Sequence, residues 1–260
     1  MRIVVPIKQV PETSAVTMDE QTGTMIREGV EAIINPLDLY AIEVAIRLRE
    51  ARGGETIAVS MGPPKAVTAL KEALAMGIDT AVLITDKAFA GSDTWATSYV
   101  LAAAIRRIGE FDLVICGERA TDGDTGQVGP GIAEHLGIPQ ATYAVDVEIE
   151  ERTFHVKRLL AGRFETVEMK LPALLTADKH MNNPRHAGLR GVMAARKEEI
   201  ATWSIADIEA DPERCGLSGS PTTVVEIFPP QRSHKGERLE GEPHDVACQL
   251  FAKLRENQII

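Results

Sequence analysis

The sequence predicts an α/β fold whose core is a doubly wound, mostly parallel sheet. Four short apolar runs, at 2–8, 55–61, 80–85 and 111–116, have the length and β-branched content of strands buried on both faces. Further along the chain, each run is followed by a stretch with apolar residues at helical spacing. Repeated strand and helix pairs favour a parallel sheet with right-handed crossovers and helices on both faces.

The first predicted helix has a clear start and a clear end. Asn35 can cap it, Pro36 suits the first helical position, and Gly53 stops it. The free N–H groups at the same helix start could instead line a nucleotide site, although capping is the commoner use of such residues.

Further elements follow from turn and cap residues. A helix is expected at 65–76, and Ser92 or Asp93 can cap another that continues to residue 108. Between the first strand and the first helix, the segment 15–28 is predicted to form a small hairpin.

The second half of the chain changes pattern. Apolar and polar residues alternate at 144–149, 153–160 and 166–169, which predicts an antiparallel hairpin extension of the sheet. The run 172–177 is apolar throughout and is expected to return to the main sheet as a buried strand. From residue 182 onward the periodicity is weak, which suggests two parts, 1–181 and 182–260.

A C-terminal arm ends the chain. The segment 243–256 predicts an amphipathic helix with Val246, Leu250, Phe251 and Leu254 on one face. This helix could dock onto its own domain or onto a partner subunit.

Composition and charge exclude several functional classes. A net charge of −10 disfavours binding to nucleic acid or to anionic membranes, and aromatic residues make up only 4% of the chain. No apolar run could span a bilayer, and no leader segment is visible, so a cytoplasmic protein is expected. The spacing of the three cysteines and six histidines predicts neither a disulfide framework nor a metal site.

A glycine-rich loop follows the predicted strand at 111–116. Gly123, Gly126, Gly129 and Gly131 lie between this strand and a short helix. Spaced glycines let the backbone approach a ligand, and a helix N-terminus favours a phosphate such as a nucleotide pyrophosphate. The loop is neither a dinucleotide fingerprint nor a P-loop, so an ordinary surface turn is the alternative.

Two acidic residues within this loop are not expected to contact a phosphate. Asp122 and Asp124 would repel a phosphate, so we expect them to bond ribose hydroxyls or to cap backbone amides near the helix start. No nucleophile elbow, catalytic Cys-His pair or paired-carboxylate motif accompanies the loop, so any chemistry would come from a bound cofactor.

Several segments resemble the beta subunit of the electron transfer flavoproteins in order and spacing. They include IVVPIKQVP, INPLDLYAIEVAIRL, VSMGP, TDGDTGQVGP and the stretch from VKRLLAGRFETVEMKLPALLTA to NPRHAGLRGVM. The resemblance implies a Rossmann-like domain that binds an adenine nucleotide and pairs with an FAD-carrying alpha subunit. It also implies electron transfer from a flavin dehydrogenase, such as an acyl-CoA or hydroxy-acid dehydrogenase.

The resemblance also implies binding positions. They come after the predicted strands and at helix starts, as the residue patterns also suggest: Pro6, Asn35, Pro36, Leu37, Asp38, Met61, Asp122, Gly123, Asp124, Thr125, Gly126, Gln127, Val128, Gly129, Pro130, Gly131, Ile132 and Ala133.

The segment NPRHAGLRGVMAARK resembles the recognition loop of the family, whose central leucine is here Leu189. The resemblance implies that Leu189 enters an apolar pocket of the partner dehydrogenase, whereas an isolated leucine is more often an ordinary surface residue. Three residues depart from the usual pattern: Arg190 replaces a usual proline, and Ala161 and Arg163 replace usual acidic or glycine residues.

The choice between FAD and AMP depends on the stretch KAFAGSDTWATSY. It resembles the electron-bifurcating branch of the family, in which a second FAD takes the place of a structural AMP. Asp93, Thr94 and Thr97 would then meet the ribityl chain or flavin edge, although a plain helix cap is the alternative. In this branch NADH reduces the flavin, and electrons pass to ferredoxin and to the flavin of the alpha subunit.

Other functions stay open. The chain could be an electron-transfer subunit alone, with AMP, or the NADH-oxidising flavin site of an oxidoreductase complex. A stand-alone nucleotide-binding protein of the universal-stress type is a further alternative, but it would not need the hairpin and the C-terminal arm. An adenylating enzyme would need a lysine or serine motif near the glycine loop, and the sequence has none.

Overall fold

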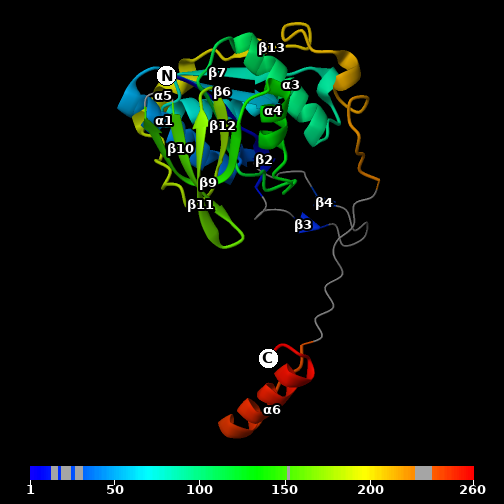
Figure 1. Cartoon of the computed structure of the whole chain (residues 1–260). Helices are drawn as coiled ribbons and strands as arrows, with labels where there is room; N and C mark the ends of the chain where they lie inside the picture. The colour runs from blue at the N-terminus through cyan, green and yellow to red at the C-terminus, as the bar shows by residue number, and fades with distance from the viewer. Residues whose placement is uncertain (13–16, 19–24, 27–31, 151–152, 226–235) are drawn as a thin grey trace.

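A nine-stranded sheet forms the centre of the computed structural model, which describes residues 1–12, 17–18, 25–26, 32–150, 153–225 and 236–260. The strand order is β11-β10-β9-β12-β8-β1-β6-β7-β13 (Figure 1). The strands are β1 Arg2–Pro6, β6 Glu55–Met61, β7 Thr80–Ile84, β8 Leu113–Gly117, β9 Gln140–Glu150, β10 Thr153–Leu160, β11 Arg163–Lys170, β12 Ala173–Ala177 and β13 Ala201–Trp203.

Neighbouring strands from β9 through β12, β8, β1, β6 and β7 to β13 are parallel. Two pairs of helices cover opposite faces of this parallel part. They are α1 Pro36–Arg52 with α2 Val67–Met76 on one face, and α3 Thr94–Ile108 with α4 Val128–Leu136 on the other. The predicted doubly wound, mostly parallel α/β fold is therefore confirmed.

Strand β1 shows why its sequence suits this position. Ile3 and Val5 pack with residues of α1 and α2, whereas Val4 packs with residues of α3 and α4. All three side chains are fully buried. Because successive side chains of a strand point to opposite faces, only a continuous apolar run satisfies a sheet that helices cover on both sides.

The antiparallel extension is also confirmed. Strand β10 pairs antiparallel with both β9 and β11, and β12 returns between β9 and β8. Ala161 and Gly162 form the turn between β10 and β11, with φ of 46° and 76°. Positive φ at two successive residues is what a two-residue hairpin turn of type I′ requires.

Two regular elements lie in the part after residue 182, where the sequence has only weak periodicity. Helix α5 spans Leu189–Lys197, and β13 adds a parallel strand beside β7 at the edge of the sheet. Helix α5 packs on α2 through small residues, so a Cβ added at Gly191 would lie 2.3 Å from the carbonyl oxygen of Ala75. The division into 1–181 and 182–260 stays a prediction, although α5 and β13 both pack against the first part.

Two small antiparallel pairs lie between β1 and α1 in the sequence. Strand β2 (Gln9–Pro11) pairs with β5 (Ala32–Ile34), which the sequence does not predict. Strand β3 (Thr17–Met18) pairs with β4 (Met25–Ile26), as the predicted hairpin at 15–28 requires. The turn of that hairpin falls outside the described residues.

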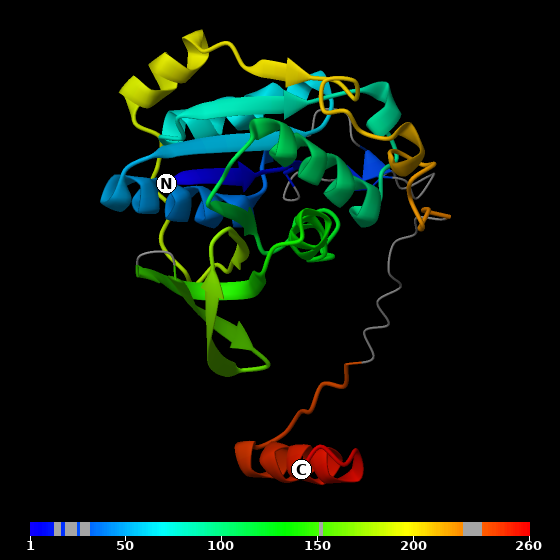
Figure 2. The ribbon, with the colours of Figure 1, turned by 45° about the horizontal axis from the view of Figure 1, so that its top comes forward.

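Helix α6 (Pro243–Glu256) lies apart from the sheet in both overall views (Figure 1 and Figure 2). None of its residues is buried, and Leu250 and Phe251 are 49% and 58% exposed. The predicted helix is therefore present, but its apolar face is not covered by its own domain. Within the described residues, no helix is long and apolar enough to cross a membrane.

Candidate nucleotide-binding site

A cavity of about 350 Å³ opens at the carboxyl ends of the central strands. Its walls include Pro6 at the end of β1, Met61 at the end of β6, and Cys116 and Gly117 at the end of β8. The chain passes from β1 to β6 in one direction along the sheet, and β8 lies on the other side of β1. Ligands of doubly wound sheets bind at such a switch point.

Most of the residues predicted for the site line this cavity. They are Pro6, Asp38, Met61, Asp93, Thr94, Thr97, Gly123, Thr125, Gly126, Gln127, Val128 and Gly129. The others lie behind the wall or beside it: Asn35, Pro36, Leu37, Asp122, Asp124, Pro130, Gly131, Ile132 and Ala133. Of these, Ile132 and Ala133 are fully buried in the core under α4.

Asn35 is the N-cap residue of α1, as predicted, but its side chain makes no capping hydrogen bond. Its side-chain amide donates to Asp38 Oδ1 at 2.9 Å and to the carbonyl oxygen of Arg119 at 2.9 Å. Its side-chain oxygen accepts from the N–H of Thr121 at 3.1 Å. Asn35 therefore ties the start of α1 to the glycine-rich loop, because two of its three hydrogen bonds, to Arg119 and Thr121, cross between the two segments.

Asp38 is a buried acid in the cavity wall. Its carboxylate accepts from the backbone N–H of Lys8 at 2.7 Å and from Asn35. Burial raises the pKa of Asp38 to about 7, although these hydrogen bonds act in the opposite direction. The cavity therefore contains a carboxyl group that titrates near neutral pH.

Asp122 and Asp124 are paired with basic residues. The carboxylate of Asp122 accepts from Lys8 Nζ at 2.7 Å, and Asp124 Oδ1 lies 2.6 Å from Arg119 Nε. Neither acid caps α4, whose N-cap residue is Gln127 without a side-chain hydrogen bond. The expected capping of backbone amides is therefore wrong, and these pairs instead fix the loop beside the cavity.

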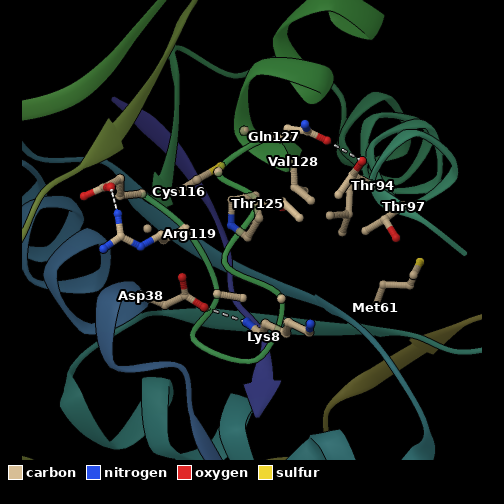
Figure 3. A pocket seen from close by; sticks show the side chains of 18 of the residues that line it. Lys8, Asp38, Met61, Thr94, Thr97, Cys116, Arg119, Thr125, Gln127 and Val128 are labelled. Atoms are coloured by element: carbon tan, nitrogen blue, oxygen red, sulfur yellow. Dashed lines mark hydrogen bonds and ion pairs between the residues drawn. The ribbon is translucent and has the colours of Figure 1, made fainter. Parts of the chain in front are cut away.

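The start of α3 forms another wall of the cavity. Asp93 caps this helix, accepting from the N–H groups of Trp95 and Ala96 at 2.9 and 3.1 Å, as the sequence predicts. Its other oxygen accepts from the N–H and hydroxyl of Thr222. Thr94 donates to Gln127 Oε1 at 2.9 Å. In Figure 3, Thr94, Thr97 and Met61 lie across the cavity from Asp38, Arg119 and Cys116.

Comparison with known proteins identifies the family. The model of the electron transfer flavoprotein domain matches residues 22–208, which is more than half of the chain. The chain belongs to the electron transfer flavoprotein family.

Three relatives match along nearly their full length. The chain is 46% identical over 262 residues to the caffeyl-CoA reductase-Etf complex subunit CarD of Acetobacterium woodii. It is 48% identical over 261 residues to an electron transfer flavoprotein subunit beta of Thermoanaerobacterium thermosaccharolyticum. Both matches cover 100% of each chain. Identity to the protein FixA of Azorhizobium caulinodans is 42% over 267 residues, which covers 99% of this chain and 95% of FixA.

Two glycines of the glycine-rich loop in this flavoprotein chain, Gly126 and Gly129, are required for different physical reasons. Gly126 has a φ of 64°, which L side chains rarely adopt, so it is required by the turn of the loop. A Cβ on Gly129 would lie 2.7 Å from Thr176 Cγ2. Gly129 is thus needed for close packing of α4 on β12, rather than only for the approach of a phosphate.

Sequence reasoning missed an acidic pair beside the cavity of this flavoprotein. Glu118 and Asp178 follow the neighbouring parallel strands β8 and β12 and share a hydrogen bond. Burial, with the contact to Asp178, raises the pKa of Glu118. Burial opposes ionisation of Asp178 too, but its hydrogen bonds to His180 and Glu118 outweigh burial and lower its pKa. The pair thus favours protonation at Glu118 rather than at Asp178.

The missed wall residues also include Ile7, Lys8, Ser92, Leu101, Cys116, Gly117, Arg119 and Ala120. Ile7 and Ser92 are direct sequence neighbours of predicted residues, and Cys116 and Gly117 end strand β8. Burial raises the pKa of the Cys116 thiol, so this cysteine stays protonated. Proximity to the strand ends was the available signal for these residues.

Leu189 is not part of the cavity wall and lies on a different surface of the domain. It is the first residue of α5 and is 79% exposed. Met193, one turn further along, is 57% exposed on the same face. Together they give α5 an exposed apolar edge, which is an arrangement suited to a docking contact.

Proposed function

We propose that this chain is the beta subunit of a heterodimeric, electron-bifurcating flavoprotein, and that its cavity holds FAD. In this proposal the chain pairs with an alpha subunit that carries its own FAD, in the cytoplasm. NADH donates electrons to the flavin of the beta subunit. The electrons then divide between ferredoxin and the alpha-subunit flavin, which serves a partner dehydrogenase.

The observation that carries the proposal is the extent of the cavity. One part lies at the switch point between Pro6, Asp38 and the glycine-rich loop, which suits an adenine nucleotide. A second part is bordered by Met61, Thr94 and Thr97. AMP would need only the first part, whereas FAD has a ring system to place in the second. The 46% identity to CarD, a subunit of a caffeyl-CoA reductase-Etf complex, supports the same choice.

The residues present fit such a cofactor chemically. The open N-terminus of α4 and the backbone around Gly126 would hold the pyrophosphate, and Lys8 neutralises the charge of Asp122 beside it. The hydroxyl of Thr97 and the apolar side chains of Met61 and Leu101 would face the flavin end. When bound, the flavin would accept a hydride and release electrons singly, while this chain orients it and excludes water.

AMP remains a second candidate, and one observation favours it. Both oxygens of Asp93 are already used, one by the cap of α3 and the other by Thr222. The start of α3 therefore also fits a helix cap that needs no ligand. The stand-alone nucleotide-binding function loses support, because the full-length relatives carry the names of subunits.

Docking to a dehydrogenase is the second part of the proposal. The apolar edge formed by Leu189 and Met193 on α5 would enter an apolar pocket of that partner. Arg190, Arg196 and Lys197 flank the edge and are exposed. A central apolar anchor with a charged rim is the usual arrangement of a binding hot spot.

The cofactor proposal is tested by changing the flavin end of the cavity alone. In the heterodimer, we expect Thr97→Val to weaken retention of FAD in the beta subunit and to slow bleaching of flavin absorbance by NADH. Binding of AMP by the same variant should stay unchanged. Thr223→Val, an exposed threonine outside the cavity wall, is the matched control. A native heterodimer whose flavins NADH does not bleach at all would contradict the proposal.

A further inference from the structure

The segment that leads into α5 is tied to the middle of α1. The side-chain amide of Asn182 donates to the carbonyl oxygen of Tyr40 at 3.0 Å. Arg47 Nη2 donates to the carbonyl oxygen of Asn183 at 3.4 Å. One bond uses a side chain of the segment and the other its backbone, and together they hold the segment along α1, ahead of the exposed residues of α5.

Arg185 makes the strongest of these connections. Its Nε donates to Glu43 Oε2 at 2.9 Å, and its backbone N–H donates to the same oxygen at 3.1 Å. Its two terminal nitrogens donate to both oxygens of Glu50 at 2.7 and 3.0 Å. The planar guanidinium thus bridges two carboxylates that lie about two turns apart on one face of α1, which a single ammonium group cannot do with the same geometry.

Loss of the bridge would cost stability because Glu43 is buried. It is only 2% exposed, and a buried carboxylate requires ion pairs or hydrogen bonds. Arg47, at a Nε–Oε1 distance of 2.5 Å, is its other basic partner. Burial opposes ionisation of Glu43, but the hydrogen bonds from Arg185 outweigh it and lower its pKa.

Helix α5 is attached to the domain a second time, through α2. Gly191 lies directly against the backbone of Ala75 in α2, and Lys71 Nζ donates to the carbonyl oxygen of Arg196 at 3.2 Å. Leu189 therefore lies between two attachment points, Arg185 and Gly191. Both points face the body of the domain, whereas Leu189 and Met193 are exposed.

We propose that Arg185 is a positioning residue for docking: its bridge to Glu43 and Glu50 holds the start of α5 in one orientation before the partner dehydrogenase arrives. This inference rests on the proposed docking role of Leu189. A contact surface that is ordered in advance saves the entropy that would otherwise be lost on binding. The proline that is usual after the central leucine is here Arg190, and the Arg185 bridge supplies a rigid attachment ahead of it.

The test is Arg185→Lys in the complete heterodimer, because lysine keeps the charge and leaves Glu43 paired with Arg47. We expect faster amide hydrogen exchange in 186–195, with unchanged exchange in the cavity segments 6–8 and 117–129. With a purified acyl-CoA dehydrogenase of the native host and its acyl-CoA, we expect the KM for the heterodimer to rise about three- to tenfold at unchanged kcat. Glu50→Gln should give a smaller change in the same direction, and Arg163→Lys, which changes an exposed arginine of β11 away from α5, is the control.

Two outcomes separate this inference from the docking proposal. If Leu189→Ala raises the KM but Arg185→Lys changes neither the exchange of 186–195 nor the KM, the positioning role of Arg185 is refuted. If Leu189→Ala leaves the KM unchanged, docking through α5 is refuted, and the exchange data alone then show whether Arg185 orders the segment.

Discussion

A single buried carboxyl group, Asp38, makes the cavity wall sensitive to pH. Its pKa is raised from 3.8 to about 7, so the folded chain keeps a proton that the unfolded chain loses near pH 4. The stabilising contribution is therefore complete below pH 4 and is lost as the pH rises through about 7. Ionised Asp38 would also place a negative charge beside any bound phosphate.

We therefore predict that FAD binds less tightly as the pH rises from 6 to 8. Ionisation of Asp38 should weaken binding by about tenfold, because a like charge in the same cavity wall costs about 1–2 kcal/mol in a partly polar protein. Asp38→Asn should remove most of this dependence in equilibrium titrations of apoprotein with FAD. Glu118→Gln is the control for Glu118, whose pKa is also raised and which lines the same cavity. An equal pH dependence in wild type and Asp38→Asn would contradict the role of Asp38.

Gly126 and Gly123 provide a matched pair within the glycine-rich loop. Gly126→Ala would place a side chain at a φ of 64°, at a cost of about 1–2 kcal/mol, although the nearest atom lies 3.7 Å away. Gly123 has open space around it and no positive φ. We expect Gly126→Ala to lower FAD affinity about tenfold and Gly123→Ala to change it less than about twofold by calorimetry. Equal effects of the two substitutions would show that backbone strain is not the cause.

Some residues of the candidate site could be predicted because they are local features of the sequence. Pro6, Met61 and the glycines lie at strand ends or in a loop between a strand and a helix. The pair Glu118 and Asp178 could not, because it depends on β12 returning beside β8. The Lys8–Asp122 pair likewise joins residues that are 114 positions apart. Pairings between distant segments follow from topology rather than from local pattern.

At the scale of elements, the helices and strands that could be predicted are those with a strong hydrophobic pattern or a clear cap residue. The central strands have continuous apolar runs, and α3 begins at a true cap. Strand β13 has only three residues, and α5 packs through glycine and alanine rather than through large apolar side chains. Neither leaves a periodic signal long enough to distinguish it from a loop.

The turn between β10 and β11 gives a stability prediction. Ala161 has a φ of 46°, which alanine adopts at a cost and which asparagine tolerates better. We expect Ala161→Asn to raise the free energy of unfolding by roughly 0.5–1 kcal/mol. Gly162→Ala should lower it by about 1 kcal/mol, because φ is 76° and no atom lies within 4 Å to add a packing effect. Urea unfolding measures both, and stabilisation by Gly162→Ala would contradict this account of the turn.

Helix α5 gives a binding prediction. Leu189→Ala should weaken binding to the partner dehydrogenase by about 1–3 kcal/mol, the range of a buried interface anchor. Flavin content should not change, because Leu189 is not part of the cavity wall. Leu217→Ala is the control, since Leu217 is also an exposed leucine, at 65%, but lies outside α5. Equal effects of the two substitutions in binding titrations would argue against specific docking at α5.

At the scale of the whole molecule, two surfaces extend beyond the sheet domain. Helix α6 exposes Leu250 and Phe251 on an uncovered apolar face, and α5 exposes Leu189 and Met193. The predicted arm was expected to cover either its own domain or a partner, and its position favours a partner. We expect the alpha subunit to cover α6, which leaves α5 for the dehydrogenase.

The cofactor content of the native heterodimer tests the central proposal most directly. The complex should be purified from its host without added nucleotide and then denatured, and the released nucleotides should be identified by mass and by absorbance. We predict two FAD per heterodimer and no AMP. One FAD and one AMP per heterodimer would contradict the proposal and would identify this chain as a beta subunit with a structural nucleotide.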